Sequence, residues 1–390
     1  MSSRPSLLFL FKTFLIVGAS SFGGYAALVA VVQRILVERH KTIKNETIVK
    51  GFSIASVLPG PIAVNTVTYI GYSLAGWSGA FISMFAVILP SMLLMIVFAI
   101  LYETYSFMPQ IDHFLAGVIP VVMALILSAA YNIGSKNLKN IKHFIILILV
   151  LILQLLFHGY WTFILSFLIG GSLGFIFFKE SNPLDYNVSK IYYKKTHLVV
   201  VAILLLTVSL NFIEFPGDNI NLSLASVFSG ISLSLFGGGY VMIPMLNDII
   251  VLQKGWLSNT EFMNAIALGQ VTPGPILISA TFIGYKLNGI GGAIIATVGI
   301  FLPSGLLMIL VSETLKKVDE NPGWRSIFEG LKPVIIALML ASIVVLGKPI
   351  ENWWISGIIA TISAVLIIRY KVNFLWLIVV AGLIGIILIK

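Results

Sequence analysis

The chain has 390 residues, of which 58% are hydrophobic and only 10% are charged, and it contains no cysteine. A soluble domain usually carries about 25% charged residues, so this composition excludes an ordinary globular domain and indicates an integral membrane protein. The lack of cysteine excludes disulfides, thiol chemistry and cysteine-ligated metal. The formal net charge of +9 lies mostly in short loops between apolar runs, which favours topology control or an anionic substrate over nucleic acid.

The first two apolar segments, 6–37 and 46–75, each contain a helix-breaking motif. Gly23-Gly24 interrupts the first segment, and Pro59-Gly60-Pro61 interrupts the second. Proline removes a backbone donor and glycine is a poor helix former, so we expect two short helices in each segment.

Later segments repeat this alternation of broken and unbroken runs. Two further broken segments, 222–253 and 260–289, contain Gly237-Gly238-Gly239 and Pro273-Gly274-Pro275. Unbroken apolar runs suited to crossing a bilayer include 77–101, 141–157, 159–178, 196–211, 290–314, 350–368 and 372–389. The pattern predicts an all-α polytopic membrane protein with nine full spans and four broken segments.

The two halves of the chain match each other in order and spacing. At an offset of 214, Phe22-Gly23-Gly24 falls on Phe236-Gly237-Gly238 and the first Pro-Gly-Pro falls on the second. After one dropped residue the offset is 213, and Leu89-Pro90-Ser91 falls on Leu302-Pro303-Ser304. This agreement indicates an internal duplication. We therefore divide the chain into an N-terminal repeat (1–178), a linker with one transmembrane helix (179–215) and a C-terminal repeat (216–390).

The charges of the loops predict that the two repeats are inverted. The basic loops are 34–50, 136–142, 179–195, 316–325 and 369–371, and the weakly basic ones are 102–112, 157–160, 211–221 and 347–352. Cationic loops stay in the cytoplasm, so 77–101 runs outward while its partner 290–314 runs inward. This topology gives a plasma-membrane protein with a cytoplasmic N-terminus and an external C-terminus.

The same topology requires each broken segment to begin and end on one side of the membrane. Arms of about 15 residues reach only about 20 Å, whereas the hydrocarbon core is about 30 Å thick. We therefore predict four re-entrant helical hairpins whose turns are the four glycine and proline motifs. The alternative, one long kinked span per segment, would place either loop 34–50 or loop 136–142 outside.

Such turns are candidate anion sites, because helix N-termini offer free N–H groups and the positive end of the helix dipole. Glycine lets the backbone approach a ligand, and proline suits a first helical turn, so we expect new helices at about Tyr25, Pro61, Tyr240 and Pro275. The alternative for each motif is a kink or packing element. The predicted substrate-binding residues are Ser21, Phe22, Gly23, Gly24, Pro59, Gly60, Pro61, Asn65, Phe236, Gly237, Gly238, Gly239, Gln270, Thr272, Pro273, Gly274 and Pro275.

Other polar side chains near the turns, Ser20, Thr66, Ser279 and Thr281, either donate to the same anion or form ordinary helix–helix hydrogen bonds. The ionisable candidates for coupling transport to protons are Lys12, Arg34, Glu38 and Asp248. Lys12 either attracts the anion or extends its ammonium group to the cytoplasmic membrane interface. For the other three residues we favour the interpretation that they are solvated charges in loops. The five histidines form no ligand spacing, so neither a metal nor another cofactor is expected.

With these motifs placed and duplicated, the chain resembles the chromate transporter family. The resemblance covers nearly all of residues 8–132 and 222–346, and its most specific stretches are SFGGY, SVLPGP, LFGGGYVMIP, KGWLSNTEF and QVTPGPILISATFIGY. It implies export of chromate by a secondary transporter coupled to the proton gradient. The first repeat departs from the pattern, because it reads KTIKNET where the second reads GWLSNTE.

We therefore expect a secondary active transporter of an inorganic oxyanion, with chromate efflux favoured, that works by alternating access at a site between inverted repeats. The alternatives are uptake of a sulfate-like oxyanion and a passive anion pathway. HExxH and a Walker glycine loop are both missing from the sequence, so we expect neither an enzyme nor ATP-driven transport. The expected partners are the oxyanion and the lipid bilayer, with a homodimer as an option and no nucleic acid.

Overall fold

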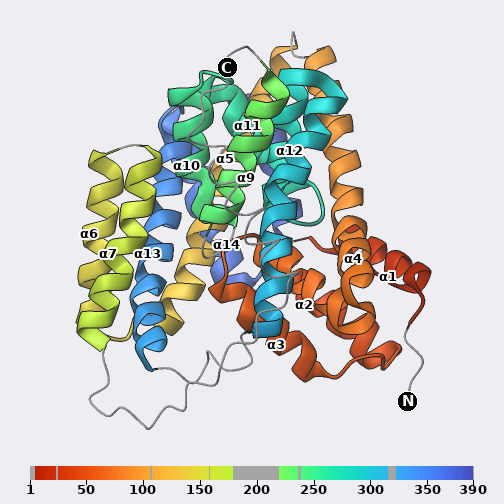
Figure 1. The fold of residues 1–390 in the computed structure, drawn as a ribbon. Coiled ribbons are helices and arrows are strands. Elements are labelled where there is room, and N and C mark those ends of the chain that lie inside the picture. Colours follow the sequence, from red (N-terminus) through yellow and green to blue (C-terminus); the bar gives the residue numbers. More distant parts are fainter. Residues whose placement is uncertain are drawn as a thin grey trace. The chain divides into compact units, whose positions relative to one another are not determined.

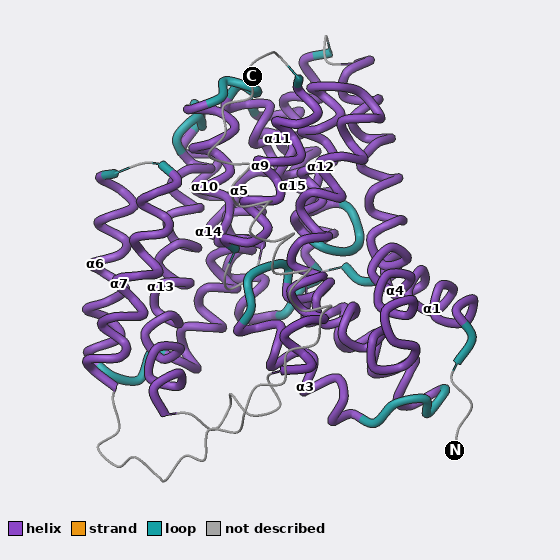
Figure 2. The backbone as a smooth tube through the Cα atoms, in the orientation of Figure 1, coloured by secondary structure: helices purple, strands orange, loops and turns teal. Residues whose placement is uncertain are grey.

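The structure, a computed structural model, describes residues 5–22, 25–105, 108–157, 159–178, 219–235, 239–314 and 322–389. The regular elements in these ranges are helices, and none of these residues is in a strand (Figure 2). Six of the helices are long and apolar enough to cross a membrane. The chain is therefore an all-α polytopic membrane protein. The predicted linker span 196–211 and the motifs Gly23-Gly24 and Phe236-Gly237-Gly238 lie outside the described residues.

The helices belong to two compact units, and each unit draws on both halves of the sequence. Unit 1 comprises the described residues within Met1–Ile100, Val188–Gly239 and Thr272–Lys317, and unit 2 comprises those within Leu101–Asn187, Tyr240–Val271 and Val318–Lys390. These units cut across the division into repeats at 1–178, 179–215 and 216–390, which stays a prediction.

Unit 1 contains the short helices that flank the glycine and proline motifs. Its elements are α1 (Leu7–Ser20), α2 (Tyr25–Val32), η1 (Gln33–Arg39, a π-helix), α3 (Asn45–Val57), most of α4 (Ile62–Tyr105), α9 (Ile220–Ser234), η4 (Ile276–Ile278) and α12 (Ser279–Thr314). The interior is apolar and includes fully buried Phe14, Phe228, Phe282 and Phe301. Helix α9 packs along α12, which ties the start of the second repeat to its long helix.

The long helices α4 and α12 are each two helices joined at a kink. Ala75 and Gly76 leave the helical conformation in α4, and Asn288 and Gly289 do so in α12. The two kinks are 213 residues apart, and each places a glycine at positive φ, +65° for Gly76 and +54° for Gly289. The kinks fall where the sequence separates segment 46–75 from span 77–101, and segment 260–289 from span 290–314.

Unit 2 is a helical bundle in which helices from the two halves of the sequence pack against one another. Its main helices are α5 (Pro109–Asn137), α6 (Ile141–Leu156), α7 (Tyr160–Phe178), α11 (Asn259–Val271), α13 (Pro322–Gly347), α14 (Trp353–Tyr370) and α15 (Phe374–Leu388). It also contains η2 (Gly239–Met242) from Tyr240 on, α10 (Ile243–Asn247) and the π-helix η3 (Asp248–Gln253). Helix α13 packs on α6 and α7 (Figure 1), while α5 packs on α14 and α15. The first half's α5 thus packs against second-half helices, and the second half's α13 packs against first-half helices.

Small residues allow the closest of these helix contacts. A β-carbon on Gly117 of α5 would collide with the backbone at Ala381 of α15, and one on Gly330 of α13 would collide with the backbone at Gly170 of α7. Gly117 and Gly330 are equivalent at the offset of 213. Close backbone approach of this kind is a frequent way to pack helices in lipid, where the hydrophobic effect does not drive association.

Candidate functional site

Both Pro-Gly-Pro motifs lie in unit 1, and each separates the helix before it from the helix after it. Helix α3 ends at Val57 and α4 begins at Ile62, and α11 ends at Val271 before η4 begins at Ile276. The central glycines have φ angles of +118° (Gly60) and +104° (Gly274), a region that side chains strongly disfavour. Each motif therefore interrupts the helical conformation between the two flanking helices.

Each interruption is held by a hydrogen bond to the other repeat. The N–H of Gly60 donates to the carbonyl oxygen of Leu235 at 2.6 Å, and the N–H of Gly274 donates to that of Ser21 at 2.7 Å. Ser21 is the C-cap of α1 and Leu235 is the C-cap of α9. The last carbonyl groups of a helix have no intrahelical partner, so each bond satisfies an otherwise unpaired acceptor. The two bonds join residues that are equivalent at the offset of 214.

Two serines of the LPS motifs complete this reciprocal packing. A β-carbon on Gly60 would collide with the side chain of Ser304, and one on Gly274 would lie 2.9 Å from the Ser91 hydroxyl. Both serines are fully buried. We did not predict Ser91 and Ser304 as site residues, although the duplicated Leu-Pro-Ser motif was the available signal. Each glycine therefore allows a serine from the other half of the chain to approach the backbone closely, whereas the sequence predicted close approach of a ligand.

The helix starts after the motifs supply unpaired donors. The carbonyl of Pro61 accepts from Asn65 N–H at 2.9 Å, so the N–H groups of the three residues between them have no intrahelical partner. Pro275 has φ −79° and ψ 134° and is the N-cap of η4. Both prolines lie one residue before the first helical position, Ile62 and Ile276, close to the expected helix starts.

In the described part of the chain, three of the five buried polar atoms that have no hydrogen-bond partner belong to residues within four positions of a Pro-Gly-Pro motif. The five atoms are Asn65 Oδ1, Ser83 Oγ, His143 Nε2, Gln270 Nε2 and Ser279 Oγ. Asn65 and Ser279 lie in unit 1, four residues beyond Pro61 and Pro275 respectively. The Asn65 amide group donates to the Pro59 carbonyl at 3.2 Å, which leaves its oxygen unpaired. An unsatisfied buried polar group costs about 1–3 kcal/mol, so such a concentration calls for a functional explanation.

Gln270 lies in unit 2 and has its own partners there. Its Oε1 accepts a hydrogen bond of 3.4 Å from the Tyr240 hydroxyl, and the Tyr240 carbonyl accepts one of 2.7 Å from the Ser342 hydroxyl. The Gln270 side chain is 5% exposed, and its Nε2 has no partner. The amide therefore presents unused donors two residues before Thr272, which is also buried.

The other polar side chains that the sequence singled out have partners inside their own helices or nearby. Ser21 donates to Val17 O at 2.6 Å, Thr66 donates to Ile62 O at 2.7 Å, and exposed Ser20 donates to Ile16 O. Thr281 and Thr297 share a hydrogen bond of 2.7 Å. For these four hydroxyls the structure matches the alternative of helix hydrogen bonding. Phe22 is half-buried, and Gly239 begins η2.

The candidate coupling residues differ in burial. Lys12 on α1 and Arg34 and Glu38 on η1 are exposed, whereas Asp248 at the start of η3 is 5% exposed. The Asp248 carboxylate accepts a hydrogen bond of 2.6 Å from the N–H of Gly159, in the turn between α6 and α7. The expectation of a solvated loop charge was wrong for Asp248. Its side chain is buried, and the N–H of Gly159 replaces water as a hydrogen-bond donor to the carboxylate.

Comparison with known proteins identifies what the chain is similar to. The family model described as Chromate transporter matches residues 8–175 and 222–386. A chromate transport protein of Cupriavidus metallidurans is 26% identical over 92% of this chain and 87% of its own length. An uncharacterized transporter of Methanocaldococcus jannaschii is 28% identical over 98% of this chain and 94% of its own. No solved structure matches the chain.

A shorter relative corresponds to about one repeat. The uncharacterized transporter YwrA of Bacillus subtilis is 31% identical over 154 residues, which is 38% of this chain and 86% of that protein. The family match also falls in two separate blocks of similar length.

Proposed function

Because the chain belongs to the chromate transporter family, we propose that it is a secondary active transporter of an inorganic oxyanion, with chromate as the favoured substrate. Membership in this family supports ion transport across a membrane. We place the substrate at the two Pro-Gly-Pro interruptions of unit 1. The carrying observation is that the buried Ser279 hydroxyl, which has no hydrogen-bond partner among the described residues and can donate to an anion, lies four residues beyond Pro275.

The chemistry at the interruptions suits a tetrahedral anion. A dianion in a membrane needs several donors and a positive potential, since an unpaired buried charge is very costly. The first-turn N–H groups of α4 lie at the positive end of the helix dipole and can donate to an anion there. The Ser279 hydroxyl adds a neutral donor. The N–H groups of Gly60 and Gly274 hold the two repeats together, so we assign the anion to the groups that follow them. Gln270 of unit 2 remains a separate donor candidate.

We further propose that the substrate is exchanged by alternating access between two inverted repeats and that proton movement drives efflux. The reciprocal bonds of Gly60 and Gly274 support a substrate site whose two halves are equivalent. Asp248 is the coupling acid we favour, because it is the buried member of the four candidates. The alternatives to chromate efflux are uptake of a sulfate-like oxyanion and passive anion flow. The oligomeric state to test is a homodimer.

Flux into proteoliposomes tests this proposal. The purified chain should carry chromate faster than sulfate, molybdate or phosphate, and an imposed pH gradient should change the rate. Faster sulfate flux would favour the alternative substrate, and a rate that ignores the gradient would exclude proton coupling. Proteoliposomes that carry none of the four anions would overturn the transport assignment.

A matched pair of variants tests the location of the site. Ser279→Ala removes an unpaired hydroxyl, whereas Thr281→Val removes one that is bonded to Thr297, two residues along the same helix. Ser279→Ala should weaken apparent chromate affinity by about tenfold or more and leave thermal stability unchanged. Thr281→Val should lose about 1 kcal/mol of stability and keep its affinity. Unchanged affinity in Ser279→Ala and in Asn65→Leu would place the anion elsewhere.

A further inference from the structure

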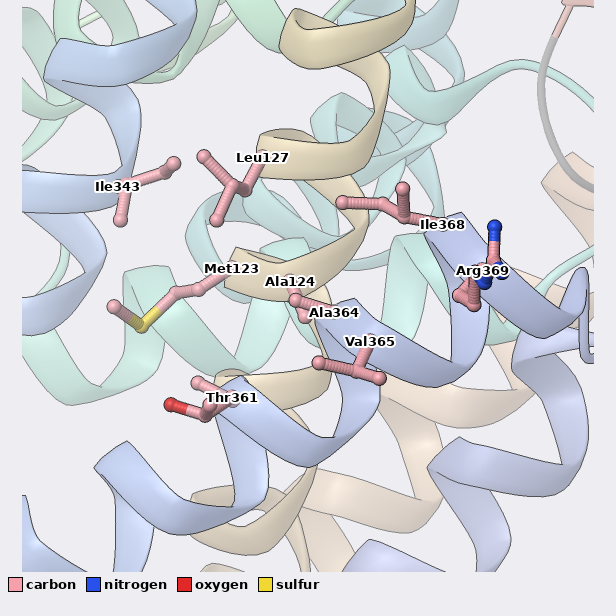
Figure 3. A pocket seen from close by; sticks show the side chains of 10 residues that line it. Met123, Ala124, Leu127, Ile343, Thr361, Ala364, Val365, Ile368 and Arg369 are labelled. Carbon is pink, nitrogen blue, oxygen red and sulfur yellow. The ribbon is translucent and has the colours of Figure 1, made fainter.

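Unit 2 contains an apolar groove of about 370 Å³ lined by α5, α13 and α14 (Figure 3). Helix α14 contributes one face of the groove through Thr361, Ala364, Val365 and Ile368, which are spaced along one side of the helix. Leu127 of α5 and Ile343 of α13 border the groove opposite Ile368 (Figure 3). A volume of this size is typical of small-molecule sites.

Small side chains create the hollow. Ala360 and Ala364 line the groove from α14, and both α13 and α14 pack on α5. At the offset of 213, helix α6 of the first repeat has Leu147 and Leu151 in place of these two alanines.

The groove opens onto a surface that suits lipid. Leu127 is 40% exposed and Val365 is 50% exposed, and α14 is one of the helices long and apolar enough to cross a membrane. Ile358 and Ile362 on the same helix are also more than half exposed. A surface of this composition in a membrane protein faces hydrocarbon.

A single cation marks one end of the groove. Arg369 lies in the last turn of α14, directly after Ile368, and it is exposed (Figure 3). It forms no hydrogen bond or ion pair with any residue that the structure describes. At the offset of 213 the first repeat carries Leu156 at this position. A basic residue at the end of a membrane helix is well placed to meet a lipid headgroup.

We infer that the α14 groove binds an anionic phospholipid, with one acyl chain in the groove and the headgroup phosphate against Arg369. The apolar lining selects a hydrocarbon chain, because the groove offers one hydroxyl, that of Thr361, and no acidic side chain. The guanidinium selects the phosphate, which it can bind with two parallel hydrogen bonds. A zwitterionic lipid would fill the same groove, but the positive group in its headgroup would offset the attraction to Arg369.

Native mass spectrometry of the detergent-purified full chain tests this inference, with phosphatidylglycerol and phosphatidylcholine added as competing probes. The wild-type chain should retain phosphatidylglycerol by preference. Arg369→Gln should reduce that preference by about fivefold, and Lys254→Gln, which removes an exposed cation of unit 2 outside the groove, should leave it unchanged. Ala364→Leu should reduce retention of both lipids by filling the groove.

Three results would overturn the inference. One is equal retention of the two lipids by the wild-type chain, and another is an unchanged preference in Arg369→Gln, an exposed position where the variant is expected to fold. The third is a change of oligomeric mass in Ala364→Leu without a change in lipid retention, which would assign the groove to a second copy of the chain. None of these readouts depends on anion transport.

Discussion

Gly60 and Gly274 each combine a positive φ angle with a neighbour that occupies the position of a β-carbon. Their φ values are +118° and +104°, and the neighbours are the side chains of Ser304 and Ser91. Any other residue at these positions therefore meets both backbone strain and a steric collision. Gly76 shares only the first penalty, since its φ is +65° and nothing lies within 4 Å of a β-carbon there.

Alanine substitutions should separate the two penalties. Gly76→Ala is expected to lose about 1–3 kcal/mol of unfolding free energy from strain alone, because its φ of 65° and ψ of −150° lie in a region that only glycine adopts readily. Gly60→Ala should lose more, roughly 3 kcal/mol or above, and Ser304→Gly in the same chain should recover part of that loss. Thermal unfolding in detergent measures all three variants. Equal losses at Gly60 and Gly76 would show that the contact with Ser304 contributes nothing.

Asp248 offers a separate test of charge and hydrogen bonding. Asp248→Ala removes the acceptor for the Gly159 N–H and should lose about 1–3 kcal/mol of stability, while Asp248→Asn keeps an acceptor and should lose less. If Asp248 couples transport to protons, flux through Asp248→Asn should no longer respond to an imposed pH gradient. Glu38→Gln changes an exposed carboxylate and is the control. A gradient response retained in Asp248→Asn would assign coupling to another group.

The Pro-Gly-Pro motifs could be predicted from the sequence, but the residues that contact them could not. The positive φ angles at Gly60 and Gly274 follow from local chemistry, because prolines on both sides leave glycine as the residue that can turn the chain. The partner of Gly60 is Leu235 and its packing neighbour is Ser304, both far away in the sequence. Periodicity and motif spacing carry no information on such pairings. Burial of Asp248 was missed for the same reason, since its donor Gly159 belongs to the other repeat.

At the scale of helices, the short elements beside the motifs have the lengths that the sequence suggested. Helices α1, α3, α9 and α11 have 14, 13, 15 and 13 residues. At 1.5 Å per residue each spans about 20 Å, less than a typical hydrocarbon core. These boundaries could be predicted because glycine and proline act locally. The cross-packing of α5 with α15 and of α13 with α7 could not, because it depends on surfaces from different repeats.

Glycines at those crossings give a test of the interleaved bundle. Gly117→Leu and Gly330→Leu should each destabilise the chain by several kcal/mol, because a side chain would force α5 from α15, or α13 from α7. Gly357→Leu on α14 is the matched control, since a β-carbon there meets nothing within 4 Å. Monodispersity on size exclusion and the temperature of unfolding are the measurements. Wild-type behaviour in both crossing variants would contradict the packing.

The topology of the whole molecule can be tested directly because the chain has no native cysteine. Single cysteines should report the side of the membrane through a thiol reagent that cannot cross it. Lys139→Cys, in a basic loop, should react only from the cytoplasm, and Glu351→Cys, in a weakly basic one, only from outside. Both positions are exposed. Reaction of the two from the same side would refute the inverted arrangement.

Another pair of cysteines distinguishes a re-entrant hairpin from a kinked span. Lys44 and Ser78 lie before α3 and after the kink of α4, on either side of the first Pro-Gly-Pro, and both are exposed. A re-entrant segment 46–75 places both on the cytoplasmic side, so Lys44→Cys and Ser78→Cys should react together. Labelling from opposite sides would support a single kinked span.

The paired bonds between the repeats also constrain the order in which the molecule is made. From Gly60 to Leu235 is 175 residues. At a synthesis rate of 5–20 residues per second, the acceptor emerges about 10–35 s after the donor. During that interval the first interruption has entered the membrane without its partner, a state in which chaperones or proteases at the translocation site can act on it. Biogenesis of this protein is therefore completed only when its second half has been inserted, and nascent chains truncated before Leu235 lack that acceptor.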